Sequence, residues 1–127
     1  MSRKIKITRA SCHCGLVQFD IHNLKEPKQI IRCNCSICSK SKGFGMVCVV
    51  LEDVRLITGK KYLSKYVFKT NKAPHFFCKI CGIHTHHRSR NRPDHFCINV
   101  ACLDGLNIKD HDNEVVNFEG RNHPRDS

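Results

Sequence analysis

The ten cysteines in these 127 residues constrain the fold more than any other feature of the sequence. Seven of them form three tight groups, Cys12-His13-Cys14-Gly15, Cys33-Asn34-Cys35-Ser36-Ile37-Cys38 and Cys78-Lys79-Ile80-Cys81-Gly82. One interpretation is a disulfide-stapled secreted fold, and the other is metal binding. Disulfide partners need Cα atoms about 4.4–6.8 Å apart and suitable Cβ vectors. Close groups of reduced thiols suit a metal ion better, so we expect a zinc protein.

The rest of the sequence is consistent with a reducing compartment. No long apolar run follows the start Met-Ser-Arg-Lys-Ile-Lys, so we expect no signal peptide and a cytoplasmic location. No apolar stretch approaches the ~20 residues of a membrane-spanning helix, so no membrane partner is expected. The length fits a single domain, residues 1–127. A domain of this size has a thin margin of stability, which metal ions bound only by the folded state would widen.

The outer two cysteine groups predict a closed structural zinc site. The spacing of Cys78 and Cys81 lets two sulfurs converge on one ion, and Gly82 frees the backbone to turn tightly after them. Zinc prefers four ligands in tetrahedral geometry, so a second close pair, Cys12 and Cys14, would complete the site. This pairing would tie the first strands of the chain to the late ones.

The middle group predicts a second zinc site of a different kind. Cys33, Cys35 and Cys38 supply three thiolates, and three protein ligands with one open position are typical of a catalytic or exchangeable zinc. The total expected is therefore two Zn²⁺. An alternative stays open, in which a fourth ligand closes this group into a structural site. The candidates for that ligand are Cys48, Cys97, Cys102 and the histidines.

Short apolar runs broken by turn residues dominate the chain, which is a β pattern. Val17, Phe19 and Ile21 alternate with polar residues and predict a strand with one buried face. Further strands are predicted over residues 4–9, 29–32, 46–51, 54–58, 62–70, 75–77, 83–88 and 96–102, with a late edge strand over 115–118 and one helical turn within 36–42. We therefore expect a mainly β fold built of antiparallel sheets.

The remaining cysteines have simple structural interpretations. Cys48 lies in the apolar run 46–51 and is expected to be a small buried hydrophobe. Cys97 and Cys102 have opposite parity along one predicted strand, so at most one of them should face the core.

The histidine-rich segment 84–87 leaves two interpretations open. Strand alternation places His84 and His86 on one face and His87 on the other, which favours a basic, partly exposed strand surface over a metal site. The functional interpretation places one of these histidines, with Arg88, near the open zinc as an anion contact. The arginine-rich run that begins at Arg88 could hold a carboxylate.

The formal net charge of +11 predicts an attraction for anions, such as small carboxylates, nucleic acid or an acidic protein surface. Lys and Arg are scattered along the chain, without a set of stacking aromatic residues or a long basic tail. Nucleic-acid binding is therefore disfavoured, and a small-molecule partner is preferred.

The order of these motifs resembles the glutathione-dependent formaldehyde-activating enzyme family, which includes centromere protein V. The resemblance rests on the three cysteine groups, on Phe77 before Cys78, and on the run Asn99-Val100-Ala101-Cys102-Leu103-Asp104. It covers a zinc-binding domain of about residues 8–120. The histidine segment followed by an Arg-rich loop is more similar to the bacterial enzyme branch than to the centromere branch.

The resemblance implies a β-tent fold around a structural zinc on Cys12, Cys14, Cys78 and Cys81, and a second zinc on Cys33, Cys35 and Cys38 that takes the thiol of glutathione. The implied activity is that of a carbon–sulfur lyase in the synthetic direction, which adds glutathione to formaldehyde to give S-(hydroxymethyl)glutathione. His86 and Arg88 would then contact the glutathione carboxylates.

One departure from the family is Asn34, where many members have His, so a proton-relay role at this position is in doubt. The alternatives to an enzyme are a non-catalytic zinc domain that binds glutathione, and a basic module that binds nucleic acid or the cytoskeleton.

Overall fold

The computed structural model describes residues 8–22, 24, 29–67, 74–89, 92–106 and 115–120. The expected mainly β fold with antiparallel sheets is confirmed. The strands are β1 (Thr8–Ser11), β2 (Gln18–Ile21), β3 (Ile30–Cys33), β4 (Met46–Val50), β5 (Val54–Thr58), β6 (Leu63–Tyr66), β7 (His75–Cys78), β8 (His84–Arg88), β9 (His95–Asn99) and β10 (Val115–Phe118). The helical turns are α1 (Cys38–Ser41) and the 3₁₀ turns η1 (Leu51–Asp53), η2 (Lys60–Tyr62) and η3 (Val100–Cys102).

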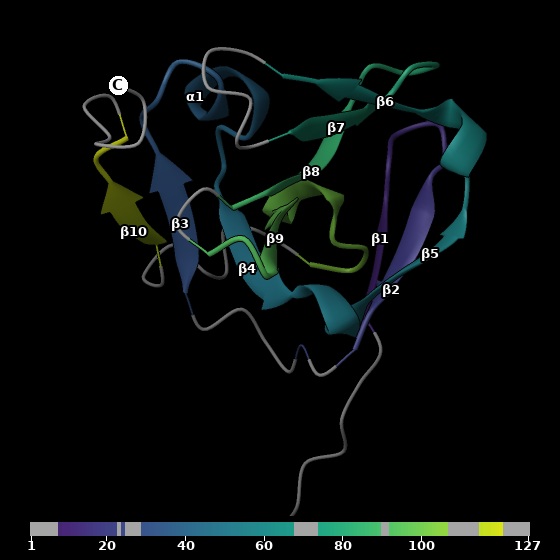
Figure 1. Cartoon of the computed structure of the whole chain (residues 1–127), viewed down its shortest axis with the longest axis horizontal. Coiled ribbons are helices and arrows are strands. Elements are labelled where there is room, and N and C mark those ends of the chain that lie inside the picture. The colour runs from purple at the N-terminus through teal and green to yellow at the C-terminus, as the bar shows by residue number, and fades with distance from the viewer. Residues whose placement is uncertain are drawn as a thin grey trace, which may run out of the picture.

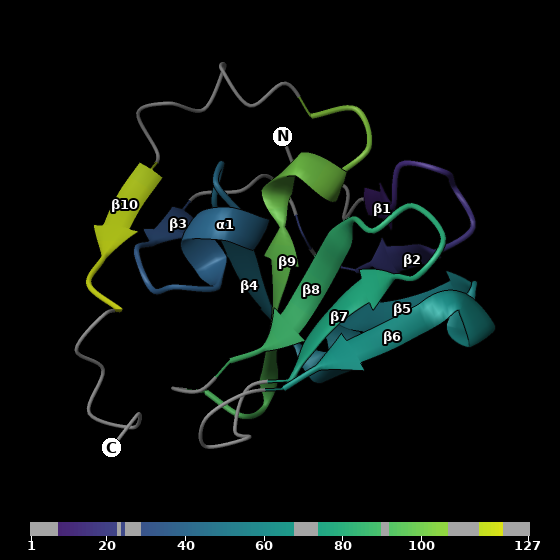
Figure 2. The same ribbon diagram turned by 90° about the horizontal axis from the view of Figure 1, so that it is seen from above.

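The described strands form two sheets, which Figure 1 shows beside each other. The smaller sheet has the order β1-β2-β5, and the larger has the order β10-β3-β4-β9-β8-β7-β6. Neighbours pair in antiparallel fashion, except that β10 runs parallel to β3. Seen from above, the larger sheet fans out from β10 to β6, with α1 lying close to β3 (Figure 2). The edge strand β10 was predicted from the sequence, but its pairing with β3 was not.

The main core lies between the two sheets. Val17, Phe19 and Ile21 are 0–1% exposed, so the predicted alternation of β2 is confirmed. Ile98 of β9 is equally buried and belongs to the same apolar cluster. The ring of Phe19 also meets the ring of His86 on β8 edge-on, with centroids 5.2 Å apart, which links the small sheet to the large one.

The predicted strand 96–102 ends early, at Asn99. The Oδ1 atom of Asn99 accepts a hydrogen bond from the backbone N–H of Ala101 at 3.1 Å, and this side-chain cap starts η3. Strand parity therefore stops at Asn99, and Cys97 and Cys102 are both buried at 4% exposure. The expectation that at most one of them faces the core is wrong. Cys48 is half-buried on β4, directly opposite Cys97 on β9.

The expectation of a partly exposed histidine surface is also wrong. Thr85, His86 and His87 are all buried, because β8 is an interior strand of the large sheet and both of its faces are covered. Phe19 of the small sheet packs on His86. On β7, the His75 ring stacks on the His87 ring, with centroids 4.5 Å apart.

Parts of three sequence predictions lie outside the described residues. These parts are residues 4–7 and 68–70 of two predicted strands, and residues 90–91 of the arginine-rich run. Within the described ranges, no helix has both the length and the apolar character needed to cross a membrane.

Candidate metal centres

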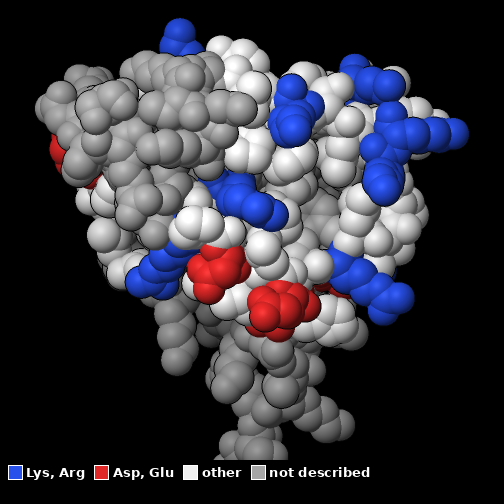
Figure 3. All heavy atoms as spheres, in the orientation of Figure 1, with Lys and Arg blue, Asp and Glu red and all other residues white. Residues whose placement is uncertain are grey.

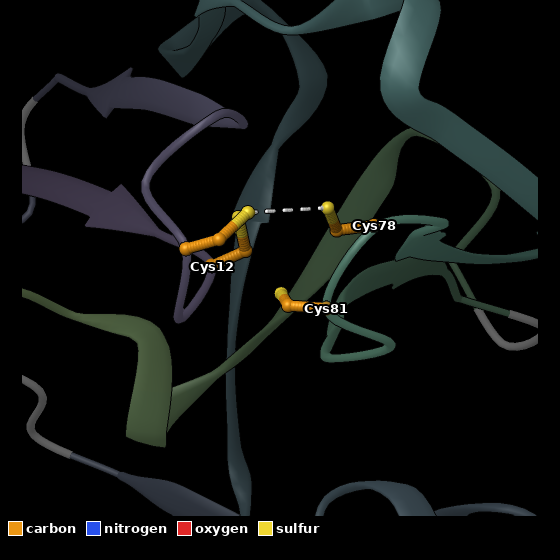
Figure 4. Close-up of side chains that lie close together, drawn as sticks. Cys12, Cys78 and Cys81 are labelled. Carbon is orange, nitrogen blue, oxygen red and sulfur yellow. Dashed lines mark hydrogen bonds between the residues drawn. The ribbon is translucent and has the colours of Figure 1, made fainter.

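Cys12, Cys14, Cys78 and Cys81 bring their sulfur atoms together, all within 4.8 Å of one another. Figure 4 shows the side chains of Cys12, Cys78 and Cys81 directed toward a common centre. The Sγ atom of Cys14 lies 3.6 Å from that of Cys12 and 3.7 Å from that of Cys78. A tetrahedral zinc with Zn–S bonds of ~2.3 Å requires sulfurs about 3.8 Å apart. The donor set and its spacing therefore fit a four-thiolate zinc.

Two similar turns place these sulfurs. After β1, the N–H of Gly15 donates to the carbonyl of Cys12 at 3.2 Å, and after β7 the N–H of Gly82 donates to the carbonyl of Cys78 at 2.7 Å. Both glycines have positive φ, 82° and 81°, which L-residues with side chains rarely adopt. The first turn also directs the N–H of Val17 at Cys12 Sγ, at 3.4 Å. The positive φ of each glycine thus allows the turn that brings the sulfur atoms together.

The four-sulfur group connects the two sheets. Cys12 follows β1 of the small sheet, whereas Cys78 is the last residue of β7 in the large sheet. Cys12 and Cys78 are buried, while Cys14 is exposed at the rim. A metal held here would act as a clasp between the two sheets.

The second group, Cys33, Cys35 and Cys38, is entirely buried, and its sulfurs also lie within 4.8 Å of one another. Cys33 ends β3, and the segment that follows leads into α1, which begins at Cys38. The N–H of Cys38 donates to Cys35 Sγ at 3.3 Å, and α1 starts with the N–H of Ser39 donating to the carbonyl of Cys35 at 3.0 Å. The helical turn thus brings two thiols next to the end of a strand.

The three thiols are not equivalent. Hydrogen bonds from the side chains of Cys33 and Cys38, and from the backbone N–H of Cys38, hold the pKa of the Cys35 thiol far below its usual value. The same interactions with Cys33 and Cys35, together with burial, raise the pKa of Cys38. A thiolate is the form of cysteine that binds zinc.

A fourth protein ligand would turn the group of Cys33, Cys35 and Cys38 into a closed site. Among the residues that the structure describes, no further Cys, His, Asp or Glu atom joins the three sulfurs within 4.8 Å. Cys97 packs against the group in the same apolar cluster, and Cys48 lies beside it. The described part of the chain thus presents three thiols, the donor set of an open zinc site.

A buried lysine beside this group was not anticipated. Lys42, just after α1, is 1% exposed, and its Nζ lies 3.3 Å from Ser41 Oγ and 3.4 Å from His75 Nδ1. Burial lowers the pKa of Lys42, and electrostatic interactions with nearby cysteines, Cys38 first, oppose that shift. A single lysine in a polar stretch carries no sequence signal of burial.

His86 and Arg88 lie apart from the cavity described next. The imidazole of His86 packs among the rings of Phe19, Phe76 and Phe96, and burial followed by the charge of Lys42 lowers its pKa to about 3. His86 is therefore neutral near pH 7. The guanidinium of Arg88 lies over the Phe96 ring, 5.8 Å from its centroid. Their contact with glutathione carboxylates stays a prediction.

A cavity of about 460 Å³ opens next to Cys33. Its walls come from the end of β3, from the α1 region and from the end of β10, and they include Arg32, Asn34, Phe118 and Glu119. This volume lies within the usual range for small-molecule sites, ~300–1,000 Å³.

The side chain of Asn34 forms hydrogen bonds with the segment after β10 and so holds that segment next to the three-thiol group. Its Nδ2 donates to Glu119 Oε1 at 2.8 Å, and its Oδ1 accepts from the N–H of Gly120 at 2.7 Å. Gly120 is packed so tightly that a Cβ atom there would overlap Cys33 Sγ. At the position where the resemblance expects His, this chain therefore has an amide that holds one wall of the cavity.

Both the sequence and the fold of this chain are similar to those of known proteins. Residues 7–118 match the family model described as glutathione-dependent formaldehyde-activating enzyme. A curated relative from Halomonas elongata, provisionally named a glutathione-dependent formaldehyde-activating enzyme, is 32% identical over 83 residues, which are 60% of this chain and 52% of the relative. The match thus spans about half the length of that relative. A crystal structure of a Rhodobacter sphaeroides protein is similar with a TM-score of 0.78 and 36% identity, covering 84% of this chain and 97% of that one.

Proposed function

Because the chain belongs to the glutathione-dependent formaldehyde-activating enzyme family, we propose that it is a zinc-dependent carbon–sulfur lyase. The proposed reaction adds glutathione to formaldehyde and gives S-(hydroxymethyl)glutathione, or acts on a related thiol adduct. One carbon–sulfur bond forms, and the thiol proton passes to the carbonyl oxygen, so no oxidant or reductant is consumed.

The observation that carries this proposal is the buried group of three thiols with a cavity at its edge. A zinc ion on Cys33, Cys35 and Cys38 would lower the pKa of an exogenous thiol and hold it as the thiolate. The protein's own contribution is to admit the thiol beside Cys33 and to orient it. Formaldehyde is small and already electrophilic, so bringing the partners together is the main task.

The four-sulfur clasp has a separate, structural role in this proposal. A second Zn²⁺ on Cys12, Cys14, Cys78 and Cys81 would be fully coordinated by protein and would stabilise the fold. Ten reduced cysteines suit a cytoplasmic location.

The basic surface fits a small anionic co-substrate. Glutathione carries two carboxylates, and the formal charge of the chain is +11. Figure 3 shows Lys and Arg side chains spread over the drawn face rather than gathered into one stripe. Such a spread of charge suits small anions, and the described residues on the drawn face form no single basic stripe for a nucleic-acid backbone.

The variant Cys35→Ser tests the proposal. Serine is nearly isosteric with cysteine, but its hydroxyl is a far poorer zinc ligand than a thiolate. We expect the variant to stay folded, to keep one zinc of two, and to lose glutathione binding and acceleration of adduct formation. Zinc content, thermal melting and calorimetric titration with glutathione are the measurements, and Cys48→Ser is the matched control outside both sulfur groups.

Each alternative predicts a different result. Glutathione binding at parental affinity in Cys35→Ser would remove the three-thiol group as the thiol site. Binding by the parent without acceleration of adduct formation would leave a non-catalytic glutathione-binding zinc domain. Affinity for duplex DNA that falls steeply with salt and is unaffected by Cys35→Ser would favour the nucleic-acid module.

A further inference from the structure

Cys48 and Cys97 are two cysteines that belong to neither sulfur group. Seven of the ten cysteines lie in the two groups, and Cys102 donates its S–H to the carbonyl of His84 at 3.6 Å. Cys48 lies on β4 and Cys97 on β9, which are neighbours in the large sheet, and the two residues are directly opposite each other. Residues opposite each other on paired strands point to the same face of the sheet, so these two side chains meet.

The backbone hydrogen bonds at both ends of this strand pair show how close the two cysteines come. At one end, the N–H of Leu51 donates to the carbonyl of Asp94 at 2.9 Å. At the other end, the N–H of Val100 donates to the carbonyl of Gly45 at 3.1 Å. Hydrogen-bonded and non-hydrogen-bonded positions alternate along an antiparallel pair, and the cysteines lie an odd number of positions from each of these bonds, so they are a non-hydrogen-bonded pair. The Cα atoms of such pairs are about 4.5 Å apart, within the ~4.4–6.8 Å range of disulfides.

The thiols of the two cysteines already interact. A hydrogen bond between them is the main cause that lowers the pKa of Cys48 and raises the pKa of Cys97. Cys48 is half-buried, whereas Cys97 is only 4% exposed. A reagent from solution therefore meets Cys48 first and has to be small, and Cys97 is held beside it as the second thiol. An accessible thiol next to a resolving thiol is the usual arrangement of redox-sensitive cysteines.

We propose that Cys48 and Cys97 form a dithiol that hydrogen peroxide oxidises to a cross-strand disulfide. Neither cysteine belongs to the proposed zinc sites, so the inference does not depend on the proposed function. The sulfur of Cys48 attacks peroxide, the O–O bond breaks, and a sulfenic acid and one water result. The sulfur of Cys97 then attacks that of Cys48, so the S–S bond forms and the second water leaves. The two thiols lose two electrons and two protons in all, and peroxide is reduced to two waters.

Thiol counting and disulfide mapping on the zinc-loaded full chain test the proposal. The protein is treated with one equivalent of hydrogen peroxide until the peroxide is consumed. The remaining thiols are blocked with N-ethylmaleimide in denaturant and chelator, and the digest is mapped by tandem mass spectrometry, with zinc release followed in parallel. We expect eight of the ten cysteines to be blocked, one disulfide between Cys48 and Cys97, and no zinc release. Dithiothreitol added before blocking should restore all ten thiols.

The variant Cys48→Ser removes the thiol that meets peroxide first. Its thiol loss should be slower than that of the parent by about 10-fold or more, because no accessible thiol of the pair remains. Cys97→Ser keeps the first thiol and removes the second, so a sulfenic acid should accumulate at Cys48, where dimedone traps it. Cys102→Ser is the matched control, because it removes a buried cysteine outside the pair, and it should oxidise at the parental rate. Thermal melting checks each fold, and the half-buried position of Cys48 lets Cys48→Ser carry the test if Cys97→Ser does not fold.

Three results would overturn the inference. The first is a peroxide-treated parent without a disulfide between Cys48 and Cys97. The second is a disulfide among the cysteines of the two sulfur groups, with zinc released, as the main product. The third is thiol loss in Cys48→Ser at the parental rate.

Discussion

Gly120 shows how closely the three-thiol group is packed at the scale of single residues. A Cβ atom at this position would overlap Cys33 Sγ and would lie 3.1 Å from Cys35 Cβ. Neither side chain can move away without moving a candidate ligand. Glycine is therefore required at position 120 because there is no room for a Cβ atom. Its backbone conformation does not require glycine, since its φ is not in the left-handed region.

Gly120→Ala should disturb the second metal site and spare the first. Overpacking in a tight interior costs about 1–3 kcal/mol, and here the strain falls on Cys33. We expect about one zinc per chain in place of two, weaker glutathione binding, and a melting temperature only modestly below that of the parent. Zinc analysis and calorimetry measure this.

Gly43→Ala is the control for that substitution. Its Cβ atom would meet nothing closer than the carbonyl oxygen of Ser39 at 3.7 Å, an ordinary contact. Zinc content should then be unchanged. If Gly120→Ala still bound two zinc ions, displacing Cys33 would not affect zinc binding, and this prediction would be wrong.

At the scale of elements, a metal ion on the four-sulfur group would hold the two sheets together through the turns after β1 and β7. The free energy of structural zinc binding, about 10–16 kcal/mol in small zinc domains, is comparable with the whole stability of a domain, about 5–15 kcal/mol. Cys78→Ser should therefore give insoluble or molten protein. Circular dichroism and thermal melting on the purified variant test this expectation.

Cys48→Ser provides the comparison, because it makes the same chemical change on β4 outside both sulfur groups. It should melt cooperatively, within several degrees of the parent. If Cys78→Ser melted like Cys48→Ser, the clasp between the sheets would have to lie elsewhere.

Local patterns predicted much of this architecture. The alternation of Val17, Phe19 and Ile21 predicted the buried face that continues along β2, and the spacing of Cys78 and Cys81 with the glycine after them predicted the turn after β7. The helical turn α1 lies within the predicted range 36–42. These features are set by residues close together in the sequence, so the sequence reports them directly.

Features that depend on distant residues were missed. Alternation cannot show that Thr85, His86 and His87 are all buried, because that follows from β8 lying between β7 and β9. The parallel pairing of β10 with β3 brings Gly120 to Cys33 across the sequence. The cavity and the burial of Lys42 also depend on residues that are distant in the sequence, so neither was predicted.

At the scale of the whole molecule, the buried histidines predict loss of stability in acid. The pKa of His86 is lowered to about 3, and burial holds the pKa of His87 well below its ordinary value. The native state thus keeps both rings neutral, whereas the unfolded chain binds protons near pH 6.5. Stability should fall as the pH drops below 6.5, by about 2 kcal/mol at pH 5 for His86 alone.

Chemical denaturation at pH 7 and pH 5 measures that loss, with zinc content followed in parallel because acid also protonates thiolates. His86→Phe removes the titrating group at a site already lined by Phe19, Phe76 and Phe96. The variant should lose about 2 kcal/mol less than the parent between the two pH values. An unchanged loss would mean that His86 does not contribute.

The clasp also bears on the order of events in folding. Cys14 and Cys78 are 64 residues apart, and no segment near either one supplies more than two of the four sulfurs. A cross-link closing a loop of that length restricts the unfolded chain by about 4 kcal/mol on the chain-entropy estimate for disulfides. An ion that keeps hold of these sulfurs during unfolding would leave the chain as a closed loop with both turns still adjacent. Refolding would then begin with its slowest encounter, that of the two distant turns, already made.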